Sequence, residues 1–211
     1  MHRASAIFSS LIVPFLFVLP STAQAQIKQP GQHPHYAFEL EPHFTFQWDH
    51  GPDYYGSEGV GLGLRASIPL FHNGPIPSIN NNMAITFGLD WVHFGYDRNA
   101  ACVRFRGGFC NNNWDFSANA LWFPVALQWN FFVHKSISVF GEVGLAFAHT
   151  RYSWAQPCPQ SPNGLCEYRD SSTRFPYFVF YPGARFMLSD SIGITVRVGY
   201  PHLTAGASFL F

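Results

Sequence analysis

Apolar and polar side chains alternate with a period of two along most of the chain after residue 35. In residues 36–48 the even positions are mostly aromatic or aliphatic, whereas the odd positions include Glu39, Glu41 and His43. Because successive side chains of a strand point to opposite faces, this period predicts a two-faced strand. Similar patterns recur, although Trp122 breaks the alternation in one segment and the first half of another is ambiguous. We expect eight strands, over 36–48, 60–70, 83–91, 114–132, 137–147, 174–188, 192–200 and 204–211.

The first 25 residues differ from the rest and predict a secretory signal peptide. A weakly basic start is followed by a nearly uncharged apolar run over 6–19, and Ala23-Gln24-Ala25 forms an A-x-A cleavage site. We therefore assign residues 1–25 to the signal peptide and 26–211 to one mature domain. The apolar run is shorter than the roughly 20 residues that a spanning helix needs, and no longer run follows. If the mature chain crosses a membrane, it must do so as a closed β-barrel, which satisfies its own backbone hydrogen bonds.

The composition is unlike that of an ordinary soluble domain. Aromatic residues make up 18% of the chain and charged residues only 11%, whereas about 25% charged residues is usual. Removing the leader, and Arg3 with it, leaves 11 basic and 12 acidic side chains, since 12 minus 1 is 11. With nearly equal numbers of basic and acidic side chains, the mature chain lacks the excess of basic residues that is typical of a nucleic-acid-binding protein.

The charged residues of the predicted strands fall on the face opposite the apolar stripe. A soluble eight-stranded barrel would bury its apolar face, but the bulk of the Phe, Leu, Ile and Trp side chains favours an outward apolar face and inward charges. The sequence therefore predicts an all-β, eight-stranded antiparallel up-and-down transmembrane β-barrel. Inward charges need partners, since a buried unpaired charge costs several kcal/mol. We predict an interior charge network of Glu39, Glu41, Arg65, Asp90, Glu142, Arg185 and Arg197.

A selective pore would be the functional alternative to a structural charge network. Eight strands, however, leave an interior just wide enough for side chains to fill. The sequence therefore favours a structural network.

The last strand carries a further signal. Its pattern, Thr204-x-Gly206-x-x-Phe209-x-Phe211, resembles the C-terminal recognition signal of bacterial outer-membrane β-barrels, and the chain is similar to the small OmpA-type and OmpX-type barrels. This resemblance implies residence in the outer membrane of a Gram-negative bacterium, in contact with its lipid. It also implies insertion by the barrel-assembly machinery through the C-terminal strand, a C-terminus in the periplasm, and a monomer.

If both termini lie in the periplasm, each connection between strands can be assigned to the extracellular or the periplasmic side of the membrane. Residues 49–57, 97–113, 154–172 and 201–202 become extracellular, and 71–81, 133–135 and 189–191 periplasmic, although 71–81 is long for a periplasmic turn. The cysteines occupy the two longest extracellular connections as Cys102 with Cys110 and Cys158 with Cys166. Their equal spacing predicts two local disulfides that would restrain these loops, and a cross-loop pairing such as Cys102 with Cys158 stays open. Loops braced in this way are where a binding function would reside, for a ligand that the sequence does not identify.

Evidence for catalysis is weak. His134 and Ser136 superficially resemble the catalytic pair of barrel lipid A deacylases, with Glu142 as a third member. The predicted periplasmic position of that turn and the inward parity of Glu142 oppose this interpretation. The histidines are scattered without the spacing of a metal site, so we expect no catalytic, cofactor or metal residues.

The favoured function is a structural or surface-interaction role. The main alternative, by resemblance to OmpW-like barrels, is passage of small apolar molecules. It would require a hydrophobic pocket in the extracellular half of the interior, where the alternation instead predicts polar side chains.

Overall fold

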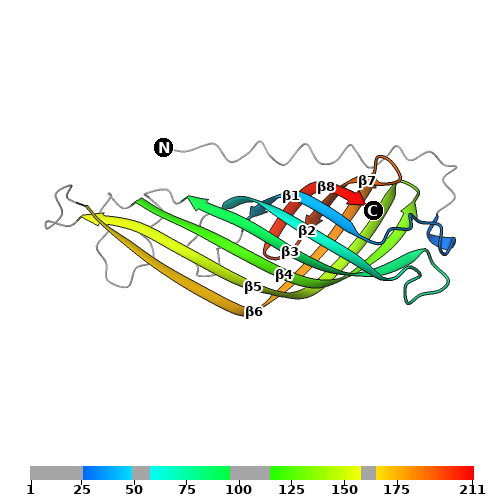
Figure 1. The fold of residues 1–211 in the computed structure, drawn as a ribbon, viewed down its shortest axis with the longest axis horizontal. Coiled ribbons are helices and arrows are strands. Elements are labelled where there is room, and N and C mark those ends of the chain that lie inside the picture. The colour runs from blue at the N-terminus through cyan, green and yellow to red at the C-terminus, as the bar shows by residue number, and fades with distance from the viewer. Residues whose placement is uncertain (1–25, 49–57, 96–114, 158–164) are drawn as a thin grey trace, which may run out of the picture.

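The computed structural model describes residues 26–48, 58–95, 115–157 and 165–211. A short 3-10 helix, η2 (Gln26–Lys28), precedes eight strands that close into one barrel in chain order, with β1 pairing both β2 and β8 (Figure 1). Every neighbouring pair is antiparallel, so the predicted all-β, up-and-down eight-stranded barrel is confirmed. No helix among the described residues is long and apolar enough to cross a membrane. The strands are β1 (Glu39–Gln47), β2 (Gly59–Phe71), β3 (Asn81–Gly95), β4 (Asp115–His134), β5 (Ile137–Pro157), β6 (Leu165–Met187), β7 (Ile192–Val198) and β8 (His202–Leu210).

The alternation seen in the sequence separates the two faces of the barrel wall. On β1, Phe44 points outward with 72% of its surface exposed, whereas its neighbours His43 and Thr45 are buried inside. Polar and charged residues dominate the largest fully buried side chains, which is the reverse of a water-soluble fold. We call the outward apolar surface the belt. Its members that are at least 44% exposed include Phe44, Leu62, Leu64, Leu89, Trp91, Val125, Val143, Leu145, Phe178, Phe180, Ile194 and Val198.

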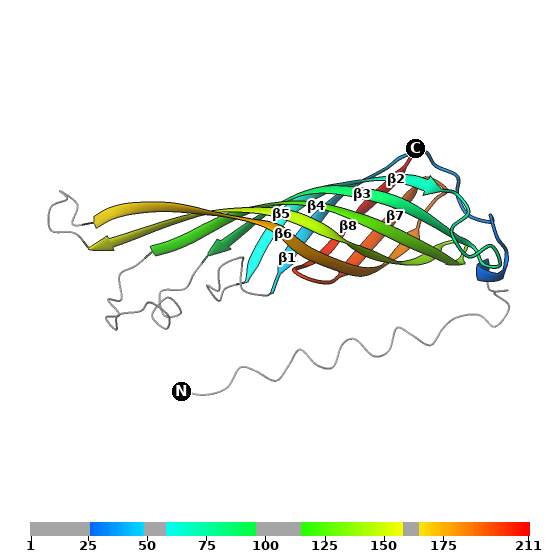
Figure 2. The same cartoon turned by 90° about the horizontal axis from the view of Figure 1, so that it is seen from below.

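The barrel rim is uneven because four strands continue beyond the others. The ends of β3 to β6 extend away from β1, β2, β7 and β8 in both views (Figures 1 and 2). We call this extension, with the strand residues at its base, the protruding sheet. It consists of residues 92–95, 115–120, 148–157 and 165–176, of which 92–94 still pair with β2. The prediction of a loop over 154–172 was therefore wrong, since β5 runs to Pro157 and β6 begins at Leu165. In this part of β5 the outward residues are polar, such as Arg151 and Ser153, and the inward residues are apolar, such as Ala148 and Tyr152. The period of two therefore continues, but with the apolar side chains on the inward face.

At the opposite end of the barrel, the segment that precedes β1 packs against the rim. We call residues 26–38 the strap. The backbone N–H of Asn80 donates to the carbonyl oxygen of Ile27 at 2.7 Å, and that of Ala37 donates to the carbonyl of Phe211 at 2.7 Å. The strap and the C-terminus thus lie together at the end away from the protruding sheet (Figure 1).

Candidate functional site

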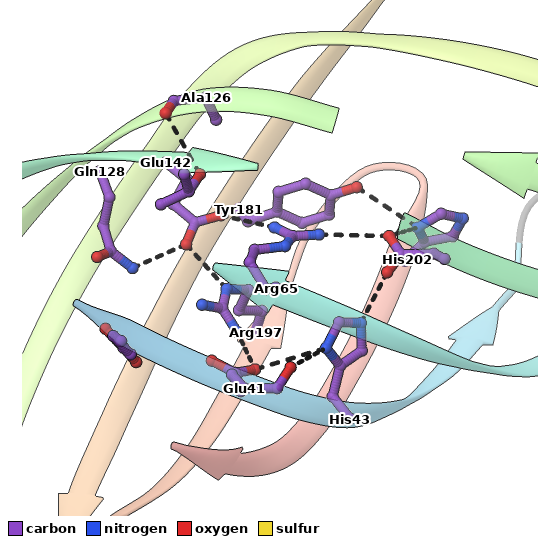
Figure 3. Close-up of polar contacts among 12 residues, drawn as sticks. Glu41, His43, Arg65, Ala126, Gln128, Glu142, Tyr181, Arg197 and His202 are labelled. Atoms are coloured by element: carbon purple, nitrogen blue, oxygen red, sulfur yellow. Dashed lines mark hydrogen bonds and ion pairs between the residues drawn. The ribbon is translucent and has the colours of Figure 1, made fainter. Parts of the chain in front are cut away.

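The half of the interior nearer the strap contains a network of buried ion pairs (Figure 3). Arg65 on β2 donates from one terminal nitrogen to Glu142 Oε2 at 2.9 Å and from the other to Asp90 Oδ2 at 3.3 Å. Arg197 on β7 donates from Nε to Glu142 Oε1 at 2.9 Å and also pairs with Glu41 on β1. These contacts join five strands, β1, β2, β3, β5 and β7, through the centre of the barrel.

The remaining two residues of the predicted network form their own pair. Arg185 on β6 pairs with Glu39 on β1, and its Nε donates to the hydroxyl of Thr195 at 3.3 Å. The structure thus places all seven predicted residues inside the barrel, each at most 1% exposed. At that burial, an ionised group without a partner would be strongly destabilising.

His43 and Gly63 also contribute to the polar half of the barrel interior. His43 Nε2 lies 2.8 Å from Asp90 Oδ1, and Gln128 Nε2 donates to Glu142 Oε1 at 2.8 Å. Gly63 faces this cluster: a β-carbon there would lie 2.2 Å from Asp90 Oδ1 and 2.3 Å from His43 Nε2. A glycine is therefore needed at this position for the His43–Asp90 contact to form.

The other half of the interior is mainly apolar, with His202 and Gln47 also buried there, which corrects the expectation of a polar interior throughout. Trp122, which broke the alternation in the sequence, points inward and is 1% exposed. Its ring meets those of Tyr177 and His202 edge to face, at centroid distances of 4.8 and 4.9 Å. Small inward residues of β4 and β5 leave room for these rings. The buried members of this apolar cluster are Val92, Phe94, Ala118, Ala120, Trp122, Ala146, Ala148, Tyr152, Val179 and Tyr181.

The distribution of side chains shows whether water or lipid surrounds the belt. Water would penalise a continuous band of exposed Phe, Leu, Ile and Val, whereas hydrocarbon requires such a band on the outside of a closed sheet. The chain is a membrane-spanning β-barrel. A closed antiparallel barrel of eight strands with an outward apolar belt and a charged interior is the architecture of small bacterial outer-membrane proteins, so this barrel resides in the outer membrane of a Gram-negative bacterium.

Comparison with known proteins gives matches by structure only. No protein-family model and no curated protein matches the sequence. Among solved structures, Ail, the attachment invasion locus protein of Yersinia pestis, is 12% identical, covering 84% of this chain and 100% of Ail with a TM-score of 0.46. Neisserial surface protein A is also 12% identical, covering 83% of this chain and 97% of that protein with a TM-score of 0.42. The conclusion that this chain spans a membrane rests on its own belt and interior.

Several predicted site residues have a defined place but an untested role. Thr204, Gly206 and Phe209 lie on β8, and Phe211 follows it, with its backbone N–H donating to the carbonyl of Phe38 at 2.8 Å. Their function as an assembly signal stays a prediction. Cys166 is the second residue of β6, whereas Cys102, Cys110 and Cys158 lie outside the described residues, as does the signal peptide. The pairing of the cysteines therefore also stays a prediction.

The deacylase-like residues do not form a triad. In the β4–β5 turn, the backbone N–H of Ser136 donates to Nδ1 of His134 at 3.2 Å. Glu142 does not orient that histidine, because its carboxylate is bound to Arg65, Arg197 and Gln128 inside the barrel.

Sequence inspection missed a row of three imidazoles at the strap. His33 and His35 of the strap and His72 after β2 have centroid separations of 5.5 and 5.3 Å. His33 Nε2 lies 2.8 Å from the carbonyl of His72, and its ring stacks on Phe132 at 4.4 Å. Within the described ranges, no three His, Cys, Asp or Glu side chains are placed to hold a metal ion. The row thus ties the strap to the long 71–81 connection, whose length the sequence left unexplained.

Proposed function

We propose that this outer-membrane barrel has a structural and surface-interaction role, with the protruding sheet and its connections as the part that meets other molecules. The observation that carries the proposal is the contrast between a filled interior and strands that extend past the belt. Among the described residues, buried ion pairs and apolar side chains occupy the interior, whereas the protruding sheet carries exposed charged residues such as Glu167 and Arg169.

The filled interior argues against a pore. Ion pairs occupy the half near the strap, and aromatic and alanine side chains occupy the other half. The strap adds a third layer, since buried Tyr36 and His33 lie beneath the rim. An ion that crossed this barrel would have to separate several buried pairs, at a cost of several kcal/mol for each charge left unpaired.

Passage of small apolar molecules remains the second candidate, because the apolar cluster occupies the half where such a path would begin. Its members are 0 to 9% exposed, so they pack on one another. A molecule entering there must displace Trp122 or its neighbours. We therefore rank this function below surface interaction.

The proposal fixes the orientation of the barrel: the strap in the periplasm and the protruding sheet outside the cell. The two lysines make this testable, because Lys28 in the strap and Lys135 in the β4–β5 turn both lie at the strap end. A membrane-impermeant amine reagent applied to intact cells should leave the native protein unlabelled and should label the Glu167→Lys variant. Glu167 is 79% exposed on the protruding sheet. Broken cells should label Lys28 and Lys135 in both proteins.

Conductance separates the surface role from a pore. In planar bilayers the refolded mature chain should show no ion-selective channel steps. Steps that Glu39→Gln or Arg185→Gln alters would contradict the proposal, as would labelling of the native lysines on intact cells.

The same role is expected of the extracellular loops. Exchange of 97–113, or of the connection 158–164 between β5 and β6, for short polar linkers should abolish adhesion of the bacterium to a responsive surface while leaving membrane permeability unchanged. Non-reducing peptide mapping should recover Cys102 with Cys110 and Cys158 with Cys166.

A further inference from the structure

Two tyrosines meet where the closed barrel wall ends and the protruding sheet begins. β6 pairs with β7 from Gly183 to Met187 and is joined to the next turn by an isolated bridge between Phe180 and Tyr200. Beyond this bridge β6 continues past the end of β7 (Figure 1). Tyr177 lies on this continuing part of β6, and Tyr200 lies in the turn between β7 and β8.

The two side chains are in direct contact. The hydroxyl of Tyr177 donates to the hydroxyl of Tyr200 at 2.6 Å, and the rings lie within 15° of parallel with centroids 5.6 Å apart. The ring of Tyr177 also meets that of buried Trp122 edge to face, with centroids 4.8 Å apart. Because Trp122 is packed in the apolar cluster, it limits the positions open to the Tyr177 ring. The two phenol groups are therefore held in one relative orientation.

This tyrosine pair can be reached from solvent. Tyr200 is 45% exposed and Tyr177 is half-buried. Tyr168 is exposed to a similar extent, 40%, but its ring stacks on Trp154 and not on a tyrosine. The buried tyrosines of the described chain are Tyr36, Tyr152 and Tyr181. Exposure and contact with a second phenol thus coincide at Tyr177 and Tyr200.

We propose that Tyr177 and Tyr200 are a site of oxidative modification, at which hydrogen peroxide and a haem peroxidase join the two rings as a dityrosine. The inference goes beyond the surface role of the barrel. It also does not depend on which end of the barrel faces the outside of the cell, so labelling of intact cells and the cross-link can fail separately.

The reaction needs two one-electron oxidations. Each phenol loses one electron and one proton and becomes a phenoxyl radical, and the hydrogen bond from Tyr177 gives its proton an acceptor at Tyr200. The unpaired electron spreads to the ring carbons next to the oxygen. One such carbon from each ring forms the new C–C bond, and the hydrogen of each of these carbons moves to the neighbouring oxygen to restore the phenol. Hydrogen peroxide takes up the two electrons and two protons and leaves as two water molecules.

The cross-link would brace the barrel rim at its least paired strand. β6 is paired with β5 from Leu165 to Phe186, whereas its ladder with β7 covers only Gly183 to Met187. A covalent bond between Tyr177 and the β7–β8 turn would add a second attachment beyond that ladder. Such a bond also closes a loop in the unfolded chain and so lowers its conformational entropy. The oxidised barrel should therefore resist unfolding more than the untreated barrel.

The test uses the full mature chain, residues 26–211, refolded in detergent micelles and treated with a haem peroxidase and limiting hydrogen peroxide. Trypsin should release residues 175–185 joined to residues 198–211, with two hydrogen atoms lost, as measured by mass spectrometry. Because groups held in contact react at a high effective concentration, this joined peptide should be at least about tenfold more abundant than in Tyr177→Phe or Tyr200→Phe. Tyr181→Phe changes the other tyrosine of the first peptide and should cross-link like the native chain.

A mixture of isotopically heavy and light chains shows whether the bond forms within one barrel. Joined peptides that are wholly heavy or wholly light support the proposal, whereas a statistical share of mixed pairs would assign the bond to collisions between barrels and overturn it. Separate peptides from a native chain whose Tyr168 has been oxidised would also overturn it, as would equal cross-linking of folded Tyr177→Phe. Boiling-dependent gel mobility shows that each variant is folded. The oxidised native barrel should keep its folded mobility to a higher temperature than oxidised Tyr200→Phe, and equal temperatures would refute the brace.

Discussion

Arg197 on β7 and Glu142 on β5 are joined across the barrel interior, with Nε of the guanidinium 2.9 Å from Oε1 of the carboxylate. The two strands are not neighbours, since β6 lies between them. The same guanidinium reaches Glu41 on β1. One cation therefore compensates two buried carboxylates from different walls.

Replacing Arg197 by methionine should lower the free energy of unfolding by about 3–5 kcal/mol, because both carboxylates lose a partner while they stay buried. Denaturant unfolding in detergent micelles, followed by tryptophan fluorescence, measures the change. Lys135→Met, an exposed cation in the β4–β5 turn, should stay within about 0.5 kcal/mol of the native chain. Adding Glu142→Gln to Arg197→Met should recover part of the loss, since the two residues are in contact. A loss below about 1 kcal/mol would mean that water reaches the network.

Trp122 and Trp91 should respond oppositely to lipid. Trp122 is 1% exposed inside the barrel, and Trp91 is 44% exposed on the belt. Brominated lipids should quench the fluorescence contributed by Trp91, and this quenching should disappear in Trp91→Phe. Trp122→Phe should leave the quenching unchanged. Trp122→Ala should also cost about 3–5 kcal/mol of stability, as expected when a large buried side chain is removed. Strong quenching of Trp122 would place lipid or solvent in the apolar cluster.

Part of the barrel architecture could be predicted from the sequence, and part could not. Strand number, closure and the inward charges could be predicted, because lipid outside and charge inside impose a period of two wherever the wall crosses the membrane. The sequence does not predict which charged residue pairs with which. Glu142 bonds to Arg65 and Arg197, which are 77 and 55 residues away in sequence. Those contacts depend on register and barrel stagger, which alternation does not specify.

The sequence was least informative where the environment changes. Beyond the belt the apolar side chains of β5, such as Tyr152 and Trp154, fall on the inward face, opposite to the parity of Leu145 and Phe147. The predicted strand therefore stopped at residue 147, and residues from 154 on were predicted as a connection. Trp122 was interpreted as a break in the alternation. An aromatic residue that truly points inward cannot be distinguished in the sequence from an outward aromatic residue at the wrong position of the pattern. The strap was not predicted at all, since its contacts with Asn80 and His72 join segments far apart in sequence.

Acid should loosen the strap. Burial lowers the pKa of the His33 imidazole below its ordinary value of 6.5, and the neighbouring His35 and His72 act in the same direction. The docked strap therefore favours neutral His33, whereas the undocked strap takes up a proton at the ordinary pKa. Docking is strongest above pH 6.5 and weakens as the pH falls from 6.5 toward the lowered pKa.

Hydrogen exchange can follow this change at the Asn80 backbone N–H, which donates to Ile27 in the strap. Its protection factor, corrected for intrinsic exchange, should fall between pH 7.5 and 5.0. His33→Phe keeps a ring that can stack on Phe132 and should remove the pH dependence, while His149→Phe on the protruding sheet should preserve it. An equal fall in His33→Phe would assign the effect to another group.

Phe211 should matter more for assembly than for stability. Its ring is 68% exposed and lies 6.3 Å from that of Phe38, so the side chain contributes little packing, and its hydrogen bonds to the strap come from the backbone. Phe211→Ala should therefore change the unfolding free energy of the refolded barrel by less than about 1 kcal/mol. If the terminal pattern is read by the barrel-assembly machinery, the same variant should nevertheless accumulate several-fold less in the outer membrane. Phe44→Ala removes an equally exposed belt ring, 72% exposed, without touching that pattern and should assemble at near-native levels. Normal outer-membrane levels of Phe211→Ala would show that the terminal ring is not an assembly signal, whereas an equal deficit in both variants would assign the effect to lost lipid contact.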